Sequence, residues 1–186
     1  MTEQKKAEQK KAEQKKADEY WLTAHLRKVI APEQLKAIVH KLKAAGKTIA
    51  TLNGSFDLLH AGHLHIIYEA SKVADILIVA LNSDSSIRQY KSIHRPIIAL
   101  EHRIQMMTAL GFVGYVTWFN ETDPRTILET IQPHVHVNGA EYGENCIEAP
   151  VIKAYGGRIH IVPLIPGLST SQVVNKIQNK DRFNSK

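Results

Sequence analysis

Short apolar runs that alternate with amphipathic segments constrain the fold of this chain more than any other feature. The clearest run, Ile76–Leu81, consists entirely of aliphatic residues, which is typical of a strand covered on both faces. Strand followed by helix, repeated along the chain, favours a parallel sheet with helices on both faces. The expected strands are residues 48–52, 76–81, 115–119, 134–138 and 159–163.

The segments between these runs have helical periodicity. A further amphipathic helix precedes the first strand, because Pro32 suits a helix start and Gly46 suits a helix end. The sequence therefore predicts an α/β protein with a Rossmann-like, doubly wound parallel sheet. The expected helices span residues 62–73, 84–90, 100–110, 124–131, 147–155 and 169–178.

The beginning of the chain differs in composition from the rest. Residues 3–17 are three copies of Glu-Gln-Lys-Lys-Ala, whose period matches neither the ~3.5 nor the ~3.6 spacing of a helix with a buried stripe. We expect a frayed helix or disordered tail without a chemical role; a tether or nucleic-acid arm is the alternative. The expected division is a low-complexity tail (1–19), a helical lead (20–46), the main domain (47–179) and a C-terminal tail (180–186).

Bulk properties narrow the class of protein. The chain of 186 residues is 44% hydrophobic, and no run approaches the ~18 apolar residues of a membrane span. Its single cysteine, Cys146, excludes an internal disulfide framework and suits a reducing compartment. The net charge of +6 comes from residues spread along the chain, without a basic stripe interleaved with aromatic residues. We expect a cytoplasmic protein that binds small polyanions, with neither nucleic acid nor membrane as a partner.

The junction after the first expected strand carries a compact polar motif, Asn53-Gly-Ser-Phe-Asp-Leu-Leu-His-Ala-Gly-His63. A helix start presents unpaired N–H groups and the positive end of the helix dipole, which attract phosphate. Gly54 and Gly62 let the main chain turn sharply and approach a ligand. Because His60 and His63 lie three residues apart, they share one face of the first helical turn. The motif predicts a polyphosphate site, although two histidines that only cap the turn are the alternative.

Other polar groups follow the remaining strands, at ends that meet at one edge of a parallel sheet. Asp84 borders this edge, and both a ligand contact and a helix cap would explain its residue type. Ser169 suits a cap too, while the hydroxyl groups beside it would also hold phosphate. His134 and His136 have no third metal ligand nearby in the sequence, so we interpret them as structural. Cys146 has no activating partner and is interpreted as inert.

The junction motif resembles the H-x-G-H signature of the cytidylyltransferase-like nucleotidyltransferases. The similarity runs from about residue 28 to residue 177 and is greatest to adenylyltransferases that make ADP-heptose for lipopolysaccharide core. Besides the junction, the residues that carry it are Val79-Ala-Leu-Asn-Ser-Asp84, Arg95-Pro96, Leu100-Glu-His-Arg103, Asn138-Gly-Ala-Glu-Tyr142, Gly156-Gly-Arg158 and Ser169-Thr-Ser171.

The resemblance implies transfer of AMP from ATP, with Mg²⁺, to a sugar 1-phosphate, by an enzyme that forms a homodimer. It implies catalytic roles for His60, His63, Lys91 and Arg103, and contacts to the sugar phosphate for Arg95 and Tyr142. No residue is expected to bind a metal directly. The nucleotide-binding residues that it implies are Asn53, Gly54, Ser55, Phe56, Asp57, Gly62, Asn82, Asp84, Asn138, Gly139, Glu141, Ser169, Thr170 and Ser171.

The chain departs from the family pattern near the expected site. The family usually has lysine at Asn138, Gly-Asp at Ala140-Glu141, an acid at Pro150 and Glu-Gly-Arg at Pro166-Gly-Leu168. Two cations are therefore absent, which leaves the acceptor open. One alternative is a cytidylyltransferase that uses CTP and glycerol 3-phosphate or another polyol phosphate. The other is a nucleotide-binding regulator without turnover.

Overall fold

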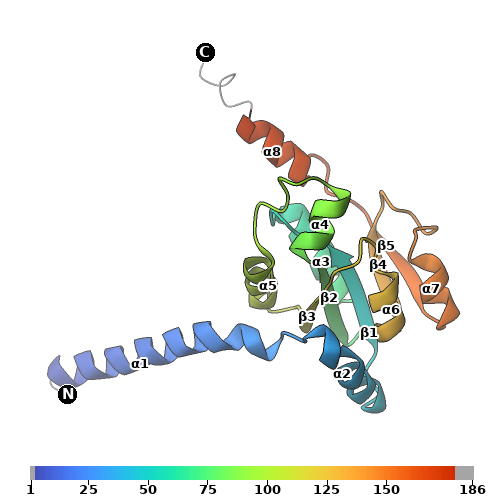
Figure 1. Ribbon diagram of the computed structural model, residues 1–186. Coiled ribbons are helices and arrows are strands. Elements are labelled where there is room, and N and C mark those ends of the chain that lie inside the picture. Colours follow the sequence, from blue (N-terminus) through green and yellow to red (C-terminus); the bar gives the residue numbers. More distant parts are fainter. Residues whose placement is uncertain (1–2, 179–186) are drawn as a thin grey trace.

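A five-stranded parallel sheet forms the centre of the protein in a computed structural model, which describes residues 3–178 (Figure 1). The strand order is β3-β2-β1-β4-β5, so the chain starts in the middle of the sheet and winds outward in both directions. All neighbouring strands pair in parallel. The strands are β1 (Ile49–Gly54), β2 (Ile76–Asn82), β3 (Tyr115–Phe119), β4 (Val135–Gly139) and β5 (Arg158–Val162).

Helices cover both faces of this sheet. Side chains alternate along each strand, so Leu52 and Val79 pack on one face while Ile49 and Ile78 pack on the other. The first face is covered by α3 (Ala61–Ser71) and α5 (Leu100–Ala109). The second is covered by α2 (Pro32–Ala44), α6 (Arg125–Ile131) and α7 (Ala149–Ala154). The doubly wound α/β fold predicted from the sequence is confirmed, and the ends of the expected strands and helices differ by two residues at most.

The N-terminal repeat forms one polar helix, α1 (Glu3–Ala24), which extends away from the sheet (Figure 1). It continues across residue 19, where a boundary between tail and helical lead was expected. After a short 3₁₀ turn (His25–Arg27) the chain pairs with β3, since Ile30 N donates to Val116 O at 2.9 Å and Val116 N donates to Lys28 O at 2.8 Å. This segment covers the outer edge of β3.

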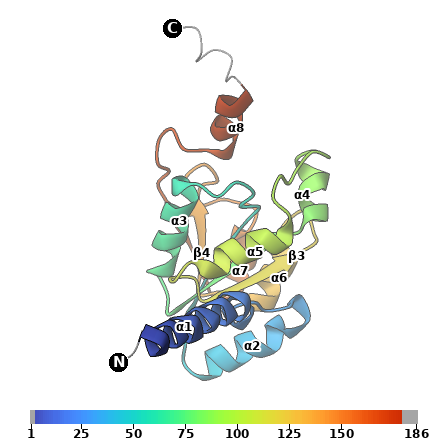
Figure 2. The same cartoon turned by 90° about the vertical axis from the view of Figure 1, so that its left-hand side faces the viewer.

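The opposite end of the sheet carries α4 (Asp84–Tyr90) and α8 (Thr170–Gln178), as Figures 1 and 2 both show. Because the strands are parallel, their carboxyl ends also lie here. The expected C-terminal tail of residues 180–186 lies outside the described residues. Among the helices of residues 3–178, none is long and apolar enough to cross a membrane.

Candidate active site

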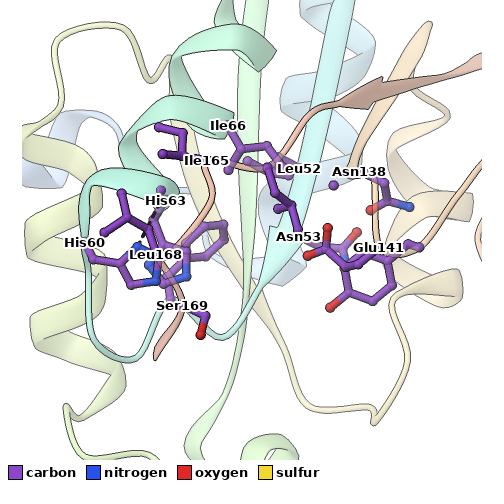
Figure 3. Close-up of a pocket in the computed structure, with 15 residues that line it drawn as sticks. Leu52, Asn53, His60, His63, Ile66, Asn138, Glu141, Ile165, Leu168 and Ser169 are labelled. Carbon is purple, nitrogen blue, oxygen red and sulfur yellow. Dashed lines mark hydrogen bonds between the residues drawn. The ribbon is translucent and has the colours of Figure 1, made fainter. Parts of the chain in front are cut away.

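A cavity of about 200 Å³ lies at the carboxyl ends of β1 and β4, beside the start of α3 (Figure 3). Half of the expected site residues line it: Asn53, Phe56, His60, Gly62, His63, Asn138, Gly139, Glu141, Tyr142 and Ser169. The junction motif, the segment after β4 and Ser169 therefore meet at one cavity, whereas the Asn82-Ser-Asp84 motif does not line it.

His60 and His63 form one wall of the cavity. Their rings stack with centroids 3.8 Å apart and an interplanar angle of 17°. His60 is also the N-cap of α3, because its Nδ1 accepts a hydrogen bond from the His63 backbone N–H at 3.3 Å. The capping interpretation thus holds for His60, yet its ring still lines the cavity.

Burial favours the neutral form of both histidines in the free protein. Burial lowers the pKa of His60 below its ordinary value. Burial, followed by the neighbouring His60, lowers the pKa of His63 to about 4. A neutral imidazole still donates one N–H, and an approaching polyanion favours its protonated form. The pair is therefore suited to receive phosphate oxygens.

Two glycines and a strained phenylalanine give this wall its shape. A Cβ on Gly62 would lie 3.0 Å from the His60 ring and 3.2 Å from the Leu168 carbonyl oxygen, so glycine lets α3 approach both. A Cβ on Gly54 would lie 3.0 Å from the Phe56 ring. Phe56 itself has a φ of 44°, which is rare for a bulky residue, and its ring meets that of His63 edge-on at 5.1 Å.

The opposite wall is formed by β1 and β4. Because Thr51 pairs with His136 in the parallel register, Asn53 and Asn138 are the neighbouring pair two residues further along. The Asn53 Oδ1 atom is buried and has no hydrogen-bond partner among the described residues. The Glu141 carboxylate lies against Gly139, in space that a Cβ would occupy. This wall therefore presents oxygen acceptors.

Sequence reasoning missed the apolar lining of the cavity. Leu52 and Ile66 come from the sheet and α3, whereas Leu164, Ile165 and Leu168 come from the loop before α8. Aliphatic residues in strands and helices are normally predicted to lie in the hydrophobic core. Their sequence pattern therefore does not indicate a ligand contact. The loop residues lie outside regular elements, and Leu164 is 53% exposed, which is a weak signal of a binding surface.

The start of α8 lies on the same side of the cavity as the start of α3, since a Cβ on Gly62 would lie 3.2 Å from the Leu168 carbonyl oxygen (Figure 3). Ser169 lines the cavity and caps α8, because its Oγ accepts from Gln172 N at 3.3 Å. The capping interpretation is therefore confirmed for Ser169. Thr170 and Ser171 form the first turn of α8 and do not line the cavity. Their contact with phosphate stays a prediction.

Arg103 does not line the cavity either. Its buried guanidinium group connects several segments of the chain by hydrogen bonds. Its guanidinium donates to the carbonyl oxygens of Ile98 (3.0 Å), Ser55 (2.7 Å) and Asn82 (2.8 Å). Nη2 also binds Asp84 Oδ1 at 2.7 Å. These contacts hold the loop after β1 against the end of β2 and the start of α4. Each nitrogen of the Arg103 guanidinium therefore has a partner within the fold. The expected contact of Arg103 with phosphate stays a prediction.

Asp84 does not cap α4, and that interpretation is wrong. The cap is Ser83, whose hydroxyl accepts from Ser86 N at 3.2 Å. Asp84 instead lies in the first turn and binds Arg103. Asn82 is buried at the end of β2 and donates to the Ser86 hydroxyl at 3.0 Å. Arg103 connects both residues to the loop after β1. Neither residue lines the cavity.

Asp57 is a second buried anchor. Its Oδ1 accepts from the backbone N–H groups of Ile97 and Ile98 at 2.7 and 2.8 Å. Its Oδ2 lies 2.6 Å from Arg95 Nε, and the Asp57 side chain is 1% exposed. Since both oxygens are engaged, Asp57 fixes the loop between α4 and α5 to the loop after β1. The ion pair with Asp57 also holds the Arg95 side chain in place.

Lys91 is the most available cation of this loop. Its Nζ donates to the Ser55 hydroxyl at 2.8 Å. Burial, followed by the neighbouring Arg95, lowers the pKa of Lys91 below its ordinary value. No carboxylate of the described part of the chain pairs with Lys91, so an anionic ligand would gain a charged contact there.

His134 and His136 make contacts within the fold, as their interpretation as structural residues requires. His134 Nδ1 accepts from Ile49 N at 3.0 Å. His136 Nδ1 lies 2.8 Å from the Thr51 hydroxyl, and burial lowers the pKa of His136 to about 4. Among the described residues there is no group of three or more His, Cys, Asp and Glu side chains suited to hold a metal.

Comparisons with known proteins agree with this geometry. The model of the cytidylyltransferase-like family matches residues 51–177. The bifunctional protein HldE of Pseudomonas aeruginosa is 38% identical over 155 residues, which cover 83% of this chain and 33% of that protein. HldE of Geotalea uraniireducens is 40% identical over 147 residues, or 78% of this chain and 30% of that protein. The chain thus spans about a third of the length of these relatives.

Solved structures share the fold. The crystal structure of a lipopolysaccharide core biosynthesis protein from Thermoplasma volcanium is 28% identical with a TM-score of 0.53; the match covers 64% of this chain and 98% of that one. Pantoate-beta-alanine ligase of Francisella tularensis, 16% identical, matches 81% of this chain and 77% of its own with a TM-score of 0.54. The second likeness concerns the fold alone. Together with the match over residues 51–177, the histidine-lined cavity shows that this chain belongs to the cytidylyltransferase-like family of nucleotidyltransferases.

Proposed function

We propose that this protein transfers AMP from ATP to a sugar 1-phosphate, with heptose 1-phosphate as the expected acceptor, and releases pyrophosphate. The observation that carries the proposal is the stacked pair His60 and His63 at the start of α3, facing a cavity that Ser169 lines from the start of α8. Two helix starts and two imidazoles around one cavity provide the N–H groups that a polyphosphate requires.

The reaction needs alignment more than a strong base. An oxygen of the acceptor phosphate attacks the α-phosphorus of ATP, the new P–O bond forms, and the bond to the β-phosphate oxygen breaks as pyrophosphate leaves. A phosphate monoester is largely ionised near pH 7, so its oxygen is already nucleophilic. His60, His63 and Lys91 then neutralise charge that develops on the α-phosphate and on the leaving group.

Arg103 and Asp57 have an indirect part in this proposal. Arg103 binds the Ser55 carbonyl and Asp57 holds Arg95, so both fix the loops that carry Lys91 and the H-x-G-H segment. We therefore propose that they position phosphate-binding groups. Arg95, beside Asp57, and Tyr142, which lines the cavity, are the proposed contacts for the sugar phosphate.

The acceptor is proposed from the relatives. HldE proteins match over most of this chain, and the structure from Thermoplasma volcanium belongs to a lipopolysaccharide core biosynthesis protein. These likenesses support ADP-heptose as product and lipopolysaccharide core as its use. Two features of the chain agree with an anionic acceptor: Lys91 has no carboxylate partner within residues 3–178, and Arg95 lies beside it.

Mg²⁺ fits this site as part of the nucleotide complex. Magnesium retains several waters and binds phosphate oxygens with one or two carboxylates at most. The carboxylates nearest the loops, Asp57 and Asp84, are already bound to arginines, while Glu141 lines the cavity. We propose that the ion enters with ATP, bound to the phosphates, and would neutralise phosphate charge.

We further propose that the enzyme is a homodimer that acts in the cytoplasm. Members of this fold family commonly pair, and the lone thiol of Cys146 is buried and reduced, as suits a reducing compartment. Light scattering of the purified protein tests the dimer: a mass near twice that of the chain is expected, and a monomer at micromolar concentration contradicts it.

A pyrophosphate-release assay tests the proposed activity. ATP and CTP are each combined with heptose 1-phosphate and with glycerol 3-phosphate, and release is measured with Mg²⁺ present. We expect release only from ATP with heptose 1-phosphate. Release from CTP with glycerol 3-phosphate would identify a cytidylyltransferase instead. Nucleotide binding without release from any pair would identify a regulator.

A further inference from the structure

A buried carboxyl group lies behind the β1–β4 wall of the cavity. Glu148, at the N-cap of α7, is 6% exposed. Its Oε2 accepts a hydrogen bond from Asn138 Nδ2 at 3.4 Å, and Asn138 lines the cavity. Burial, followed by a hydrogen bond that the Cys146 thiol donates to Glu148, raises the pKa of that thiol. Neither of these two donors to Glu148, the Asn138 amide and the Cys146 thiol, is charged.

Burial of this carboxyl group is costly in such surroundings. A buried acid normally has a basic partner, and none of the ion pairs within residues 3–178 includes Glu148. The neighbouring base His136 is itself buried; burial lowers its pKa to about 4 although the charge of Glu148 opposes this shift, so His136 is neutral near pH 7. An apolar residue would fill this place at lower cost, which points to a role other than stability.

The contact with Glu148 fixes which way the Asn138 amide faces. Because the amide nitrogen donates to Glu148, the amide oxygen is left for the other side. Figure 3 shows that oxygen on the side of Asn53 and Glu141. A free asparagine turns either its donor or its acceptor toward a ligand, whereas an asparagine held at its nitrogen offers only its acceptor.

The cavity is consequently divided by hydrogen-bond polarity. The wall of α3 and α8 offers ring N–H donors from His60 and His63, which lie beside the starts of both helices. The opposite wall offers the Asn138 amide oxygen, the unpartnered Asn53 Oδ1 and the Glu141 carboxylate. A nucleoside triphosphate has the complementary division: acceptor oxygens on its phosphates, and donor hydroxyl and amino groups on its nucleoside.

We infer that Glu148 is a positioning residue for nucleotide recognition, which turns the Asn138 oxygen toward the cavity so that this wall binds the hydroxyl or amino donors of the nucleoside. The inference rests on the proposed function for the identity of the ligand. It assigns no contact between Glu148 and the nucleotide; Glu148 acts through Asn138.

Calorimetric titration of ATP with Mg²⁺, without acceptor, tests this assignment in the full-length protein. Glu148→Met removes the acceptor that holds Asn138 and keeps the volume apolar. We expect the Kd for ATP to rise about tenfold, while the melting temperature stays the same or rises because the buried carboxyl group is gone. Glu148→Gln keeps an amide oxygen that accepts from Asn138, so it should bind ATP within about threefold of wild type.

Asn138→Ala completes a double-mutant cycle. If Glu148 acts through Asn138, Glu148→Met in the Asn138→Ala background should weaken ATP binding no further. Unchanged affinity in Glu148→Met, equal losses in the Met and Gln variants, or additive losses in the double variant would each overturn the inference. Failure of wild type to bind ATP would instead overturn the proposed function, so the two failures are distinguishable.

The turnover of the same variants gives an independent readout. A positioning role toward the nucleoside predicts a raised KM for ATP with kcat changed by less than about threefold, since the phosphate-binding groups are intact. A merely structural role predicts the reverse pattern, a lower melting temperature with an unchanged KM. That result would also overturn the assignment.

Discussion

Two pairs of histidines, His60 with His63 and His134 with His136, have opposite surroundings. The first pair begins a helix at the carboxyl end of β1 and stacks along a cavity. In the second pair, His134 directly precedes β4 and accepts from the backbone of β1, while His136 lies on β4 and meets the Thr51 hydroxyl. Both pairs are close in the sequence and chemically alike. Their position relative to the strand ends separates a binding role from a structural one.

The pKa values sharpen this contrast. His63 and His136 both have a pKa lowered to about 4, mainly by burial. A lowered pKa alone therefore does not identify a functional histidine. His63 lines a cavity with two helix starts around it, whereas the ring of His136 is enclosed by the fold. Access to a ligand, not the shift, distinguishes them.

The largest expected effect is the loss of turnover in His63→Ala. One preorganised donor to the transition state is removed, so kcat should fall by about 10²-fold or more. His134→Ala is the matched control, because this exposed side chain lies at the amino end of β4. Steady-state pyrophosphate release measures both variants. Near-normal turnover in His63→Ala would remove the difference between the two pairs.

His136→Ala should instead reduce stability. The variant leaves the buried Thr51 hydroxyl without its partner, which costs about 1–3 kcal/mol of unfolding free energy. Urea unfolding followed by circular dichroism measures the loss, and the folded variant should lose far less turnover than His63→Ala. A variant as stable as wild type would show that His136 does not hold β4 to β1.

The start of α8, on the same side of the cavity as His60 and His63, should affect nucleotide affinity. Replacing Thr170 and Ser171 together by Ala should weaken ATP binding about tenfold and leave sugar-phosphate binding unchanged, if the start of α8 holds the terminal phosphates. Ser169→Ala should cost about 1 kcal/mol of stability, as the loss of a cap does. Calorimetric titration decides, and unchanged ATP affinity in the double variant would leave the histidines without this partner.

A smaller effect is expected in the pH dependence of stability. The folded-state pKa values of His63 and His136 lie below the ordinary 6.5, so the unfolded chain binds protons first as pH falls. Their contribution to stability is present above pH 6.5 and is lost as pH falls toward 4. His63→Gln should therefore show a shallower decline in melting temperature over this range. An identical pH profile would place the His63 pKa near its ordinary value.

The fold was largely predictable because strong apolar runs such as Ile76–Leu81 alternate with helical patterns along the whole domain. The cavity wall with His60 and His63 was also predictable, since a helix start after a strand has a fixed place in a parallel sheet. The roles of Arg103 and Asp57 were not, because a charged residue near a crevice reads as a ligand contact until its partners are known. Glu148 gave no signal, since its burial depends on a loop packing over β4.

Histidine ring resonances followed by NMR during an ATP titration test the central claim most directly. At saturating ATP with Mg²⁺, we expect the resonances of His60 and His63 to shift and the pKa of His63 to rise from about 4, because bound phosphates favour the protonated ring. The resonances of His134 and His136 should keep their positions. Resonances of His63 that do not move while ATP binds would contradict the assignment of this cavity as the triphosphate site.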